Sequence, residues 1–444
     1  MAIPNWIRCQ NDRRKTLCKV AVFRRINIST YICAPMEYNV HTLPNGIRLL
    51  HVPSASTISH ACIIINSGSR DETEQQSGLA HFIEHLVFKR TEKRNTNQIL
   101  NRLESVGADL NAYTTKEYTC IHASFLHPYL DRTLELFNDI VFHSTFPEEE
   151  MEKEKGVILD EIASYQDQPE EAIYDDFEDL IFQGHPMGRN ILGSSASVTA
   201  LQRVDILQFI ADNYHTDKII IAVLGNYSLS QLIRIGSKHY SDIPENLHQH
   251  QRIAPIKRVI FQESQNKAIA QAHTVLGAQA YSLHDRYKTG LLLLNNHFGG
   301  TGMSSVLNLQ IREKYGIAYT IESGYSPLTD TGIFTLYFGT DIEKVDRALE
   351  LIYKEFKKLR EHPLTEIQLQ KAKNKFIGQI ALGEENRIGL IISMAKSLLE
   401  YDKIDDLETI FKKIQAVSTA DAANISAEIL DERNLSSLTF YPLT

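Results

Sequence analysis

Hydrophobic and polar positions along the chain predict the same plan twice, with strands before helices each time. Alternating apolar positions around a Pro-Asn-Gly turn predict a hairpin over 38–52, and further strands are expected at 61–66 and within 109–125. Helical patterns follow, until the continuous apolar run at 219–224 predicts a buried strand. The first plan therefore ends shortly after this run.

A polar stretch at 248–252 separates the first plan from its repetition. Strands are expected at 258–262 and 268–276, followed by a helix at 285–298 and, after two further strands, by helices over most of 342–425. Strands followed by helices, twice over, predict an α+β fold. We expect two similar α+β domains, each a mostly antiparallel sheet packed with helices, that are related by internal duplication.

The first 35 residues differ from this body. Residues 1–35 carry seven basic residues and one acid, whereas the whole chain has a formal net charge of −9. Three interpretations remain open: an organelle transit peptide, a segment that binds an acidic partner, or an upstream extension of the reading frame. We favour the extension, because Met36 leads straight into strand-like sequence. The expected domains are therefore 36–247 and 248–444.

Composition narrows the class of protein. No apolar run approaches the ~20 residues that a membrane span needs, so we expect no membrane partner, and we expect no nucleic-acid partner either. The five cysteines form no Cys-x-x-Cys motif and are few for the length, which fits a reducing compartment. A cytoplasmic protein is expected, or one of the mitochondrial matrix if the basic arm is a transit peptide.

One predicted helix carries the most informative residues of the chain. His81 and His85 are four positions apart with Glu84 between them, so an α-helix places all three side chains on one face. Two neutral imidazoles suit zinc, and a carboxylate that does not bind the metal can accept a proton from water. The order His-x-x-Glu-His is the inverse of His-Glu-x-x-His and is the inverzincin pattern. Ser77 is the expected N-cap of this helix.

Two histidines leave a catalytic zinc site one protein ligand short, because such a site normally has three and keeps one position for water. The third ligand is expected to be an acid on another helix. Glu154 and Glu161 are seven residues apart on one predicted helical face, but the residues alone do not favour Glu161 over Glu152 or Asp160. A solvated charged face remains an alternative for this helix.

Taken together, these stretches resemble the pitrilysin and mitochondrial processing peptidase family of zinc endopeptidases over nearly all of 36–444. In that family a ligand glutamate follows the motif at a similar interval to Glu161, which 75 residues separate from His85, and a second acid precedes that ligand by seven residues. The resemblance implies that His81, His85 and Glu161 bind one Zn²⁺ per chain. It also implies that Glu84 is the catalytic base and that Glu154 orients a ligand histidine.

The resemblance also implies residues that hold the substrate. The stretch 107–115 is similar to the family's active-site edge strand, in which Asn111 and the backbone of Ala112 would pair with an extended peptide. Arg312 and Tyr319 match the family's Arg and Tyr seven residues apart. As catalytic residues on the opposite wall of the site, they would position the substrate and stabilise the oxyanion.

The function implied by the resemblance is that of a zinc metalloendopeptidase, which hydrolyses unfolded peptides inside a closed chamber. Family members build the chamber from four α+β domains, and this chain supplies two. Because the chain carries both the metal motif and the Arg–Tyr pair, a homodimer is expected, with a paralogous partner as the alternative. Three other functions remain open: a non-catalytic structural or assembly subunit, a metal-binding regulatory protein, and an organellar presequence-processing subunit.

Overall fold

The computed structural model describes residues 37–247, 251–256, 259–300 and 302–443. The chain separates into Met1–Pro35 and one compact unit, Met36–Thr444. The expected basic arm and the first residues of the expected second domain, 248–250, lie outside the described residues. The arm and the domain boundaries therefore stay predictions.

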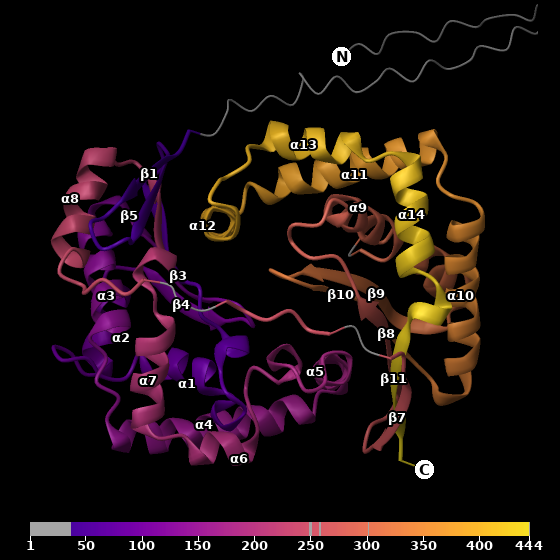
Figure 1. Cartoon of the computed structure of the whole chain (residues 1–444), viewed down its shortest axis with the longest axis horizontal. Helices are drawn as coiled ribbons and strands as arrows, with labels where there is room; N and C mark the ends of the chain where they lie inside the picture. Colours follow the sequence, from indigo (N-terminus) through magenta and orange to yellow (C-terminus); the bar gives the residue numbers. More distant parts are fainter. Residues whose placement is uncertain (1–36, 248–250, 257–258, 301, 444) are drawn as a thin grey trace, which may run out of the picture. The chain divides into compact units, whose positions relative to one another are not determined.

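The first half of the compact unit contains a six-stranded sheet in the order β1-β2-β6-β3-β5-β4 (Figure 1). Its strands are β1 Asn39–Thr42, β2 Arg48–Pro53, β3 Ile58–Ile65, β4 Asp109–Thr114, β5 Thr119–Leu126 and β6 Ile219–Gly225. Neighbouring strands are antiparallel, except that β2 and β6 run parallel. Within the described part of the chain β4 pairs with β5 alone, so β4 is an edge strand.

The second half contains a five-stranded sheet in the order β7-β11-β8-β10-β9. Its strands are β7 Gln262–Lys267, β8 Ala272–Gln279, β9 Ala318–Pro327, β10 Gly332–Thr340 and β11 Ser436–Pro442. Only β7 and β11 run parallel, and the other neighbours are antiparallel. If β7 is matched with β2, the five strands of this sheet repeat the order and directions of β2-β6-β3-β5-β4.

The helices repeat in the same way. Those of the first half are α1 Leu79–Leu86, α2 Thr96–Glu104, α3 Leu130–Phe142, α4 Glu148–Gln166, α5 Pro169–Ile181, α6 Ser195–Ala200, α7 Arg203–Asn213 and α8 Leu229–Tyr240. Those of the second half are α9 Lys288–Phe298, the π-helix Asn308–Glu313, α10 Val345–Glu361, α11 Glu366–Gly383, α12 Arg387–Tyr401, α13 Leu407–Ala416 and α14 Thr419–Ile429. Five α-helices separate β5 from β6, and five separate β10 from β11. The expected α+β fold with two similar halves is confirmed.

Each sheet is covered on one face by a helix of the other half. Ile64 and Ile220 of the first sheet share an apolar cluster with Met394 of α12. Val275 and its neighbours in the second sheet share one with Phe177 of α5. Because α5 and α12 occupy the same place in the element order, the two halves exchange equivalent helices.

One local prediction in the second half was wrong. The strand expected at 258–262 lies partly outside the described residues, and the strand observed there, β7, covers Gln262–Lys267 instead. Its sequence is entirely polar and most of its side chains are exposed, since among the described residues it is an edge strand that pairs with β11 alone. An edge strand with both faces exposed to solvent shows no alternation of apolar and polar residues. Its position could therefore not be predicted from hydrophobic periodicity.

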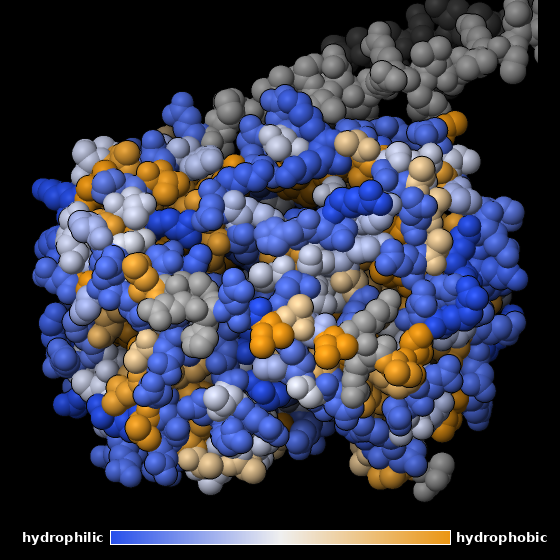
Figure 2. All heavy atoms as spheres, in the orientation of Figure 1, coloured by the Kyte–Doolittle hydropathy of each residue, from blue (hydrophilic) through white to orange (hydrophobic). Residues whose placement is uncertain are grey.

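The surface of the protein is mainly polar on the face that Figure 2 shows, where apolar residues form small separate groups. Among the described residues no helix combines the length and the apolar character needed to span a bilayer.

Candidate active site

Helix α1 presents the His-x-x-Glu-His motif on one face and apolar side chains on the other. Leu79, Phe82, Ile83 and Leu86 are buried against the first sheet and its helices. Since apolar residues recur three and four positions apart, their burial orients the intervening motif residues toward the opposite side.

The start of α1 differs from the sequence prediction. Gly78, not Ser77, is the N-cap, with φ at +94°, and a Cβ there would come within 2.6 Å of the Leu192 carbonyl oxygen. The free N–H groups of the first turn donate to a buried carboxylate: Glu72 accepts from Gly78 N at 2.9 Å and from Ala80 N at 2.7 Å. Burial raises the pKa of Glu72 to about 8, and these two hydrogen bonds oppose the rise. A carboxylate six residues upstream therefore caps this helix.

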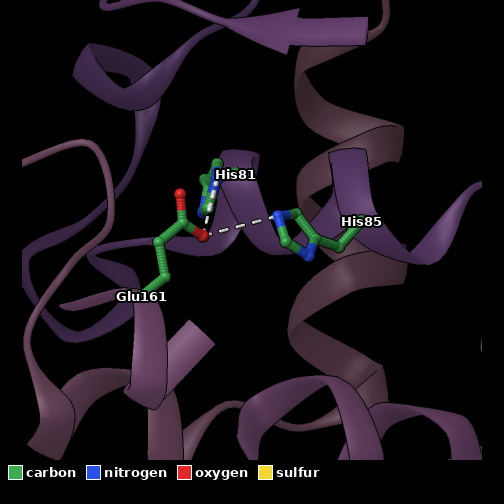
Figure 3. A group of neighbouring side chains, drawn as sticks. All are labelled: His81, His85 and Glu161. Atoms are coloured by element: carbon green, nitrogen blue, oxygen red, sulfur yellow. Dashed lines mark ion pairs between the residues drawn. The ribbon is translucent and has the colours of Figure 1, made fainter. Parts of the chain in front are cut away.

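His81, His85 and Glu161 come together as one group (Figure 3). Glu161 Oε2 lies 3.8 Å from His81 Nε2 and 3.7 Å from His85 Nε2. The three donor atoms all lie within 4.8 Å of one another, and the described residues form no second such group of histidine, cysteine or carboxylate side chains. Ligands about 2.0–2.2 Å from a tetrahedral zinc are about 3.3–3.6 Å apart. The two separations from Glu161 are a few tenths of an ångström wider, and two imidazole nitrogens with one carboxylate oxygen are donor types that zinc binds.

The histidines are arranged to offer neutral nitrogens. His85 Nδ1 lies 3.2 Å from Glu154 Oε2, which leaves His85 Nε2 facing Glu161. Glu154 is buried and also pairs with Lys89 Nζ at 2.6 Å, so its position is held from two sides. Burial, with a smaller contribution from His85, lowers the pKa of His81 to about 4. The His81 ring is therefore uncharged over the neutral range, as a metal ligand must be.

Glu84 lines the same cavity as His81 and Glu161 but is not a member of the group of three donors. Burial raises the pKa of Glu84 above its usual value, while hydrogen bonding by Thr114 opposes the rise. A carboxylate whose pKa is shifted toward neutrality is better suited to exchange protons at physiological pH.

The cavity beside the group has a volume of about 500 Å³. It is lined by residues of α1 and the end of β4, of the helices α4 and α5, of the loop at 190–192, and of the strands β9 and β10. Its carboxylates are Glu84, Glu161, Glu171, Asp175 and Glu178. The cavity wall is therefore strongly acidic.

The acidic residues of α5 were missed by the sequence reasoning. Glu171, Asp175 and Glu178 follow one another at intervals of four and three positions, which places them on one helical face. That spacing was a readable signal, but it indicates a charged face without indicating that the face lines a cavity.

Asn111 and Ala112 lie on β4, which has the expected position at the edge of the sheet. The Ala112 N–H donates to Asn111 Oδ1 at 2.8 Å. An approaching peptide strand would have to displace this side chain to reach the Ala112 N–H. The part that these two residues play in substrate binding stays a prediction.

Arg312 and Tyr319 do not line the cavity. Arg312 is exposed on the π-helix, where its Nη1 donates to Asn308 Oδ1 at 3.4 Å. Tyr319 is exposed at the start of β9, with its hydroxyl 3.5 Å from Asp341 Oδ1. One chain therefore brings together the predicted ligands and base but not the predicted Arg–Tyr pair.

Known proteins resemble this chain in sequence and in fold. Residues 49–195 match the family described as Insulinase (Peptidase family M16), and residues 200–376 match the Peptidase M16 inactive domain. An uncharacterized zinc protease of Rickettsia bellii is 30% identical over 407 residues, which cover 90% of this chain and 97% of that relative. The chain belongs to peptidase family M16. The resemblance to the pitrilysin and processing peptidase family is thereby confirmed.

A second relative and a solved structure are also similar to the chain. The uncharacterized zinc protease YmxG of Bacillus subtilis is 29% identical over 396 residues, covering 88% of this chain and 95% of the relative. In fold, the chain resembles the crystal structure of a protease from Helicobacter pylori, with a TM-score of 0.84 and 21% identity, covering 92% of this chain and all of that one. Membership in M16 and the zinc protease names of the relatives support a peptidase.

Proposed function

We propose that the protein is a zinc metalloendopeptidase that cleaves unfolded peptides. The observation that carries the proposal is the convergence of His81, His85 and Glu161, with Glu84 lining the same cavity as His81 and Glu161. The zinc protease names of the M16 relatives support the same metal.

The proposed roles follow from the positions of the side chains. His81, His85 and Glu161 would hold the metal, which when bound polarises a water molecule and the scissile carbonyl. Glu84 accepts the proton of the attacking water and delivers it to the leaving amine. Glu154 keeps the Nδ1 proton of His85 in a hydrogen bond, so that His85 Nε2 keeps its lone pair for the metal.

The proposed function is tested by metal removal. We expect one zinc per chain in the purified protein, loss of cleavage of a mixed library of unfolded peptides after chelation, and recovery on adding zinc. Metal analysis measures the zinc content, and mass spectrometry of the digest measures the cleavage of the peptides. A protein that binds zinc but cleaves no peptide would instead be a non-catalytic subunit or a regulatory metal-binding protein, and a protein without zinc affinity would contradict the proposal.

We further propose that the substrate lies extended along β4. Asn111 and the Ala112 backbone would hydrogen-bond its main chain, which gives affinity with little demand on sequence. Sequence preference would then come from the acidic cavity, which suits peptides with a lysine or arginine near the scissile bond.

The preference for basic peptides is expected to depend on pH. Burial raises the pKa of Asp175 to about 6, so this carboxyl loses its charge as the pH falls through 6. For two peptides that differ only in one Lys or Gln, we expect the ratio of kcat/KM values to fall about fivefold from pH 7.5 to pH 5, or ~1 kcal/mol. A ratio removes effects common to both peptides, such as titration of the zinc ligands.

Two variants sharpen this measurement. Asp175→Asn should show the low ratio at every pH. Asp176→Asn changes the neighbouring acid, which pairs with Lys267 at 3.0 Å and does not line the cavity, and should keep the wild-type profile. A ratio that is independent of pH in the wild type would contradict the role of Asp175.

We propose a homodimer in which Arg312 and Tyr319 of one chain complete the site of the other. The exposure of both residues outside the cavity of their own chain supports this arrangement. In a two-fold dimer the completed sites would be equivalent.

The dimer predicts complementation between inactive chains. Glu84→Gln and Arg312→Ala should each inactivate the protein alone, but their coexpression should restore about a quarter of the wild-type activity, because half of the dimers are mixed and each mixed dimer has one intact site. The measurement is peptidase activity of the coexpressed pair, with light scattering to determine its mass. An inactive mixture of dimers, or a fully active wild-type monomer, would contradict the arrangement.

A further inference from the structure

A buried cluster of charges joins the two halves of the chain at one end of β4. We call it the junction cluster; its members are Arg70, Asp71, Glu117, Arg252 and Asp330. It lies outside the acidic cavity and takes no part in the proposed chemistry.

Arg70 is the centre of the junction cluster, and its side chain is 2% exposed. Its guanidinium contacts Glu117 Oε1 at 2.5 Å, both carboxylate oxygens of Asp330 at 2.8 and 3.1 Å, and the Ile253 carbonyl at 2.9 Å. One side chain therefore holds the first half, the connecting segment and the second half.

Glu117 lies in the turn between β4 and β5 and makes a second contact with the other half. Its two carboxylate oxygens accept from Thr329 N, in the turn between β9 and β10, at 3.1 and 3.3 Å. Arg252 of the connecting segment donates to the Glu117 carbonyl at 2.6 Å and pairs with both oxygens of Asp71. The turn at the end of β4 is thus bound to three separate segments.

The backbone approaches this turn closely as well. Ser69 N and Arg70 N donate to the carbonyls of Thr115 and Lys116 at 3.1 and 2.9 Å. A Cβ on Gly68 would lie 2.4 Å from the Thr115 carbonyl oxygen, so this position has no room for a side chain. The segment that touches the turn continues directly into Glu72, the cap of the metal-binding helix α1.

The location of these contacts explains what they can do. As an edge strand, β4 is supported by β5 on one side only, and the other side is where a peptide is proposed to add. Packing against α1 holds the strand itself, and the turn that ends β4 is the point at which the strand is fixed to the second half. Burying charges is costly unless they are paired. A position of the turn that leaves one charge of the junction cluster without its partner is therefore disfavoured.

We propose that Glu117 is a positioning residue for substrate: through Arg70 and the Thr329 amide it holds the turn of β4 against the second half, so that a bound peptide lies in register with the metal-binding helix. This inference rests on the proposed function, because it assumes that β4 carries the peptide. It predicts that weakening the junction cluster impairs substrate binding and leaves the metal group intact.

The test compares Glu117→Gln with a matched control. Glu135 also accepts from two arginines, Arg94 at 2.7 Å and Arg102 at 3.1 Å, but its cluster lies wholly within the first half. For a peptide long enough to span β4, we expect Glu117→Gln to raise KM about tenfold, with kcat within about twofold and zinc content unchanged. Glu135→Gln should leave all three unchanged. A general loss of stability would affect both variants alike.

Asp330→Asn serves as a second, milder variant, because its side chain is the more exposed partner of Arg70 and keeps one acceptor oxygen. Asp330→Asn should also raise KM. This variant keeps the test possible if Glu117→Gln fails to fold. Unchanged KM in both folded variants, or an equal rise in Glu135→Gln, would overturn the proposal.

Amide hydrogen exchange separates this inference from the proposed function. If the wild type cleaves no peptide, the proposed function fails, but the junction cluster still predicts faster exchange of 109–118 in Glu117→Gln than in Glu135→Gln. Equal exchange in the two variants would show that Glu117 does not hold β4, whatever the protein does.

Discussion

Replacing Glu84 by glutamine is expected to abolish peptide hydrolysis while zinc stays bound. Glutamine has nearly the same shape but cannot accept the proton of the attacking water, so we expect a loss of about 10²–10⁴-fold in kcat. The metal should remain because Glu84 does not belong to the group of His81, His85 and Glu161. Continuous cleavage of a fluorogenic peptide and metal analysis of the same sample measure the two effects.

The control for this variant is another glutamate changed in the same way. Glu149 is fully exposed on α4 and pairs with Lys153 at 2.8 Å, away from the cavity lining. Glu149→Gln should keep full activity. If Glu84→Gln retained activity within about tenfold of the wild type, Glu84 would not be the base.

The second large effect is expected from Glu161→Ala, which should lose both zinc and activity. With Glu161 removed, only two nitrogen ligands remain, and a catalytic zinc normally needs three protein ligands. Titration with a competing chelator measures the zinc affinity, and the peptidase assay measures the consequence.

Two other acids of α4 provide comparison variants for Glu161→Ala. Glu154→Gln keeps all three ligands but weakens the hydrogen bond to His85 Nδ1, so its zinc affinity should fall about 10–100-fold. Asp160→Ala removes the adjacent exposed acid and should change neither quantity. Zinc bound as tightly in Glu161→Ala as in the wild type would mean that another residue is the third ligand.

The motif helix illustrates how far sequence could be taken. The spacing of His81, Glu84 and His85 was sufficient to predict one face of a helix, because helical periodicity acts within a few residues. The choice of Glu161 over Glu152 and Asp160 needed the family resemblance. In the structure Glu152 pairs with Lys155 and Asp160 is exposed, but nothing in the local charge pattern distinguishes the three.

What could not be predicted depends on contacts between distant segments. The cap of α1 comes from Glu72, which accepts from the N–H of the left-handed Gly78. The sequence had favoured Ser77, which lies nearer to the start of the helix. The acidic face of α5 becomes a cavity wall only when the first and second halves are packed together. Local propensity carries no information about either event.

The exchange of α5 and α12 has a consequence for how such a chain can be divided. A fragment ending after the first half would expose to water the sheet face that α12 covers, including Ile64 and Ile220. In a protein made of one half alone, that face could be covered if two copies exchanged their equivalent helices. The duplicated chain therefore has the form of a domain-swapped pair whose members have been joined into one polypeptide.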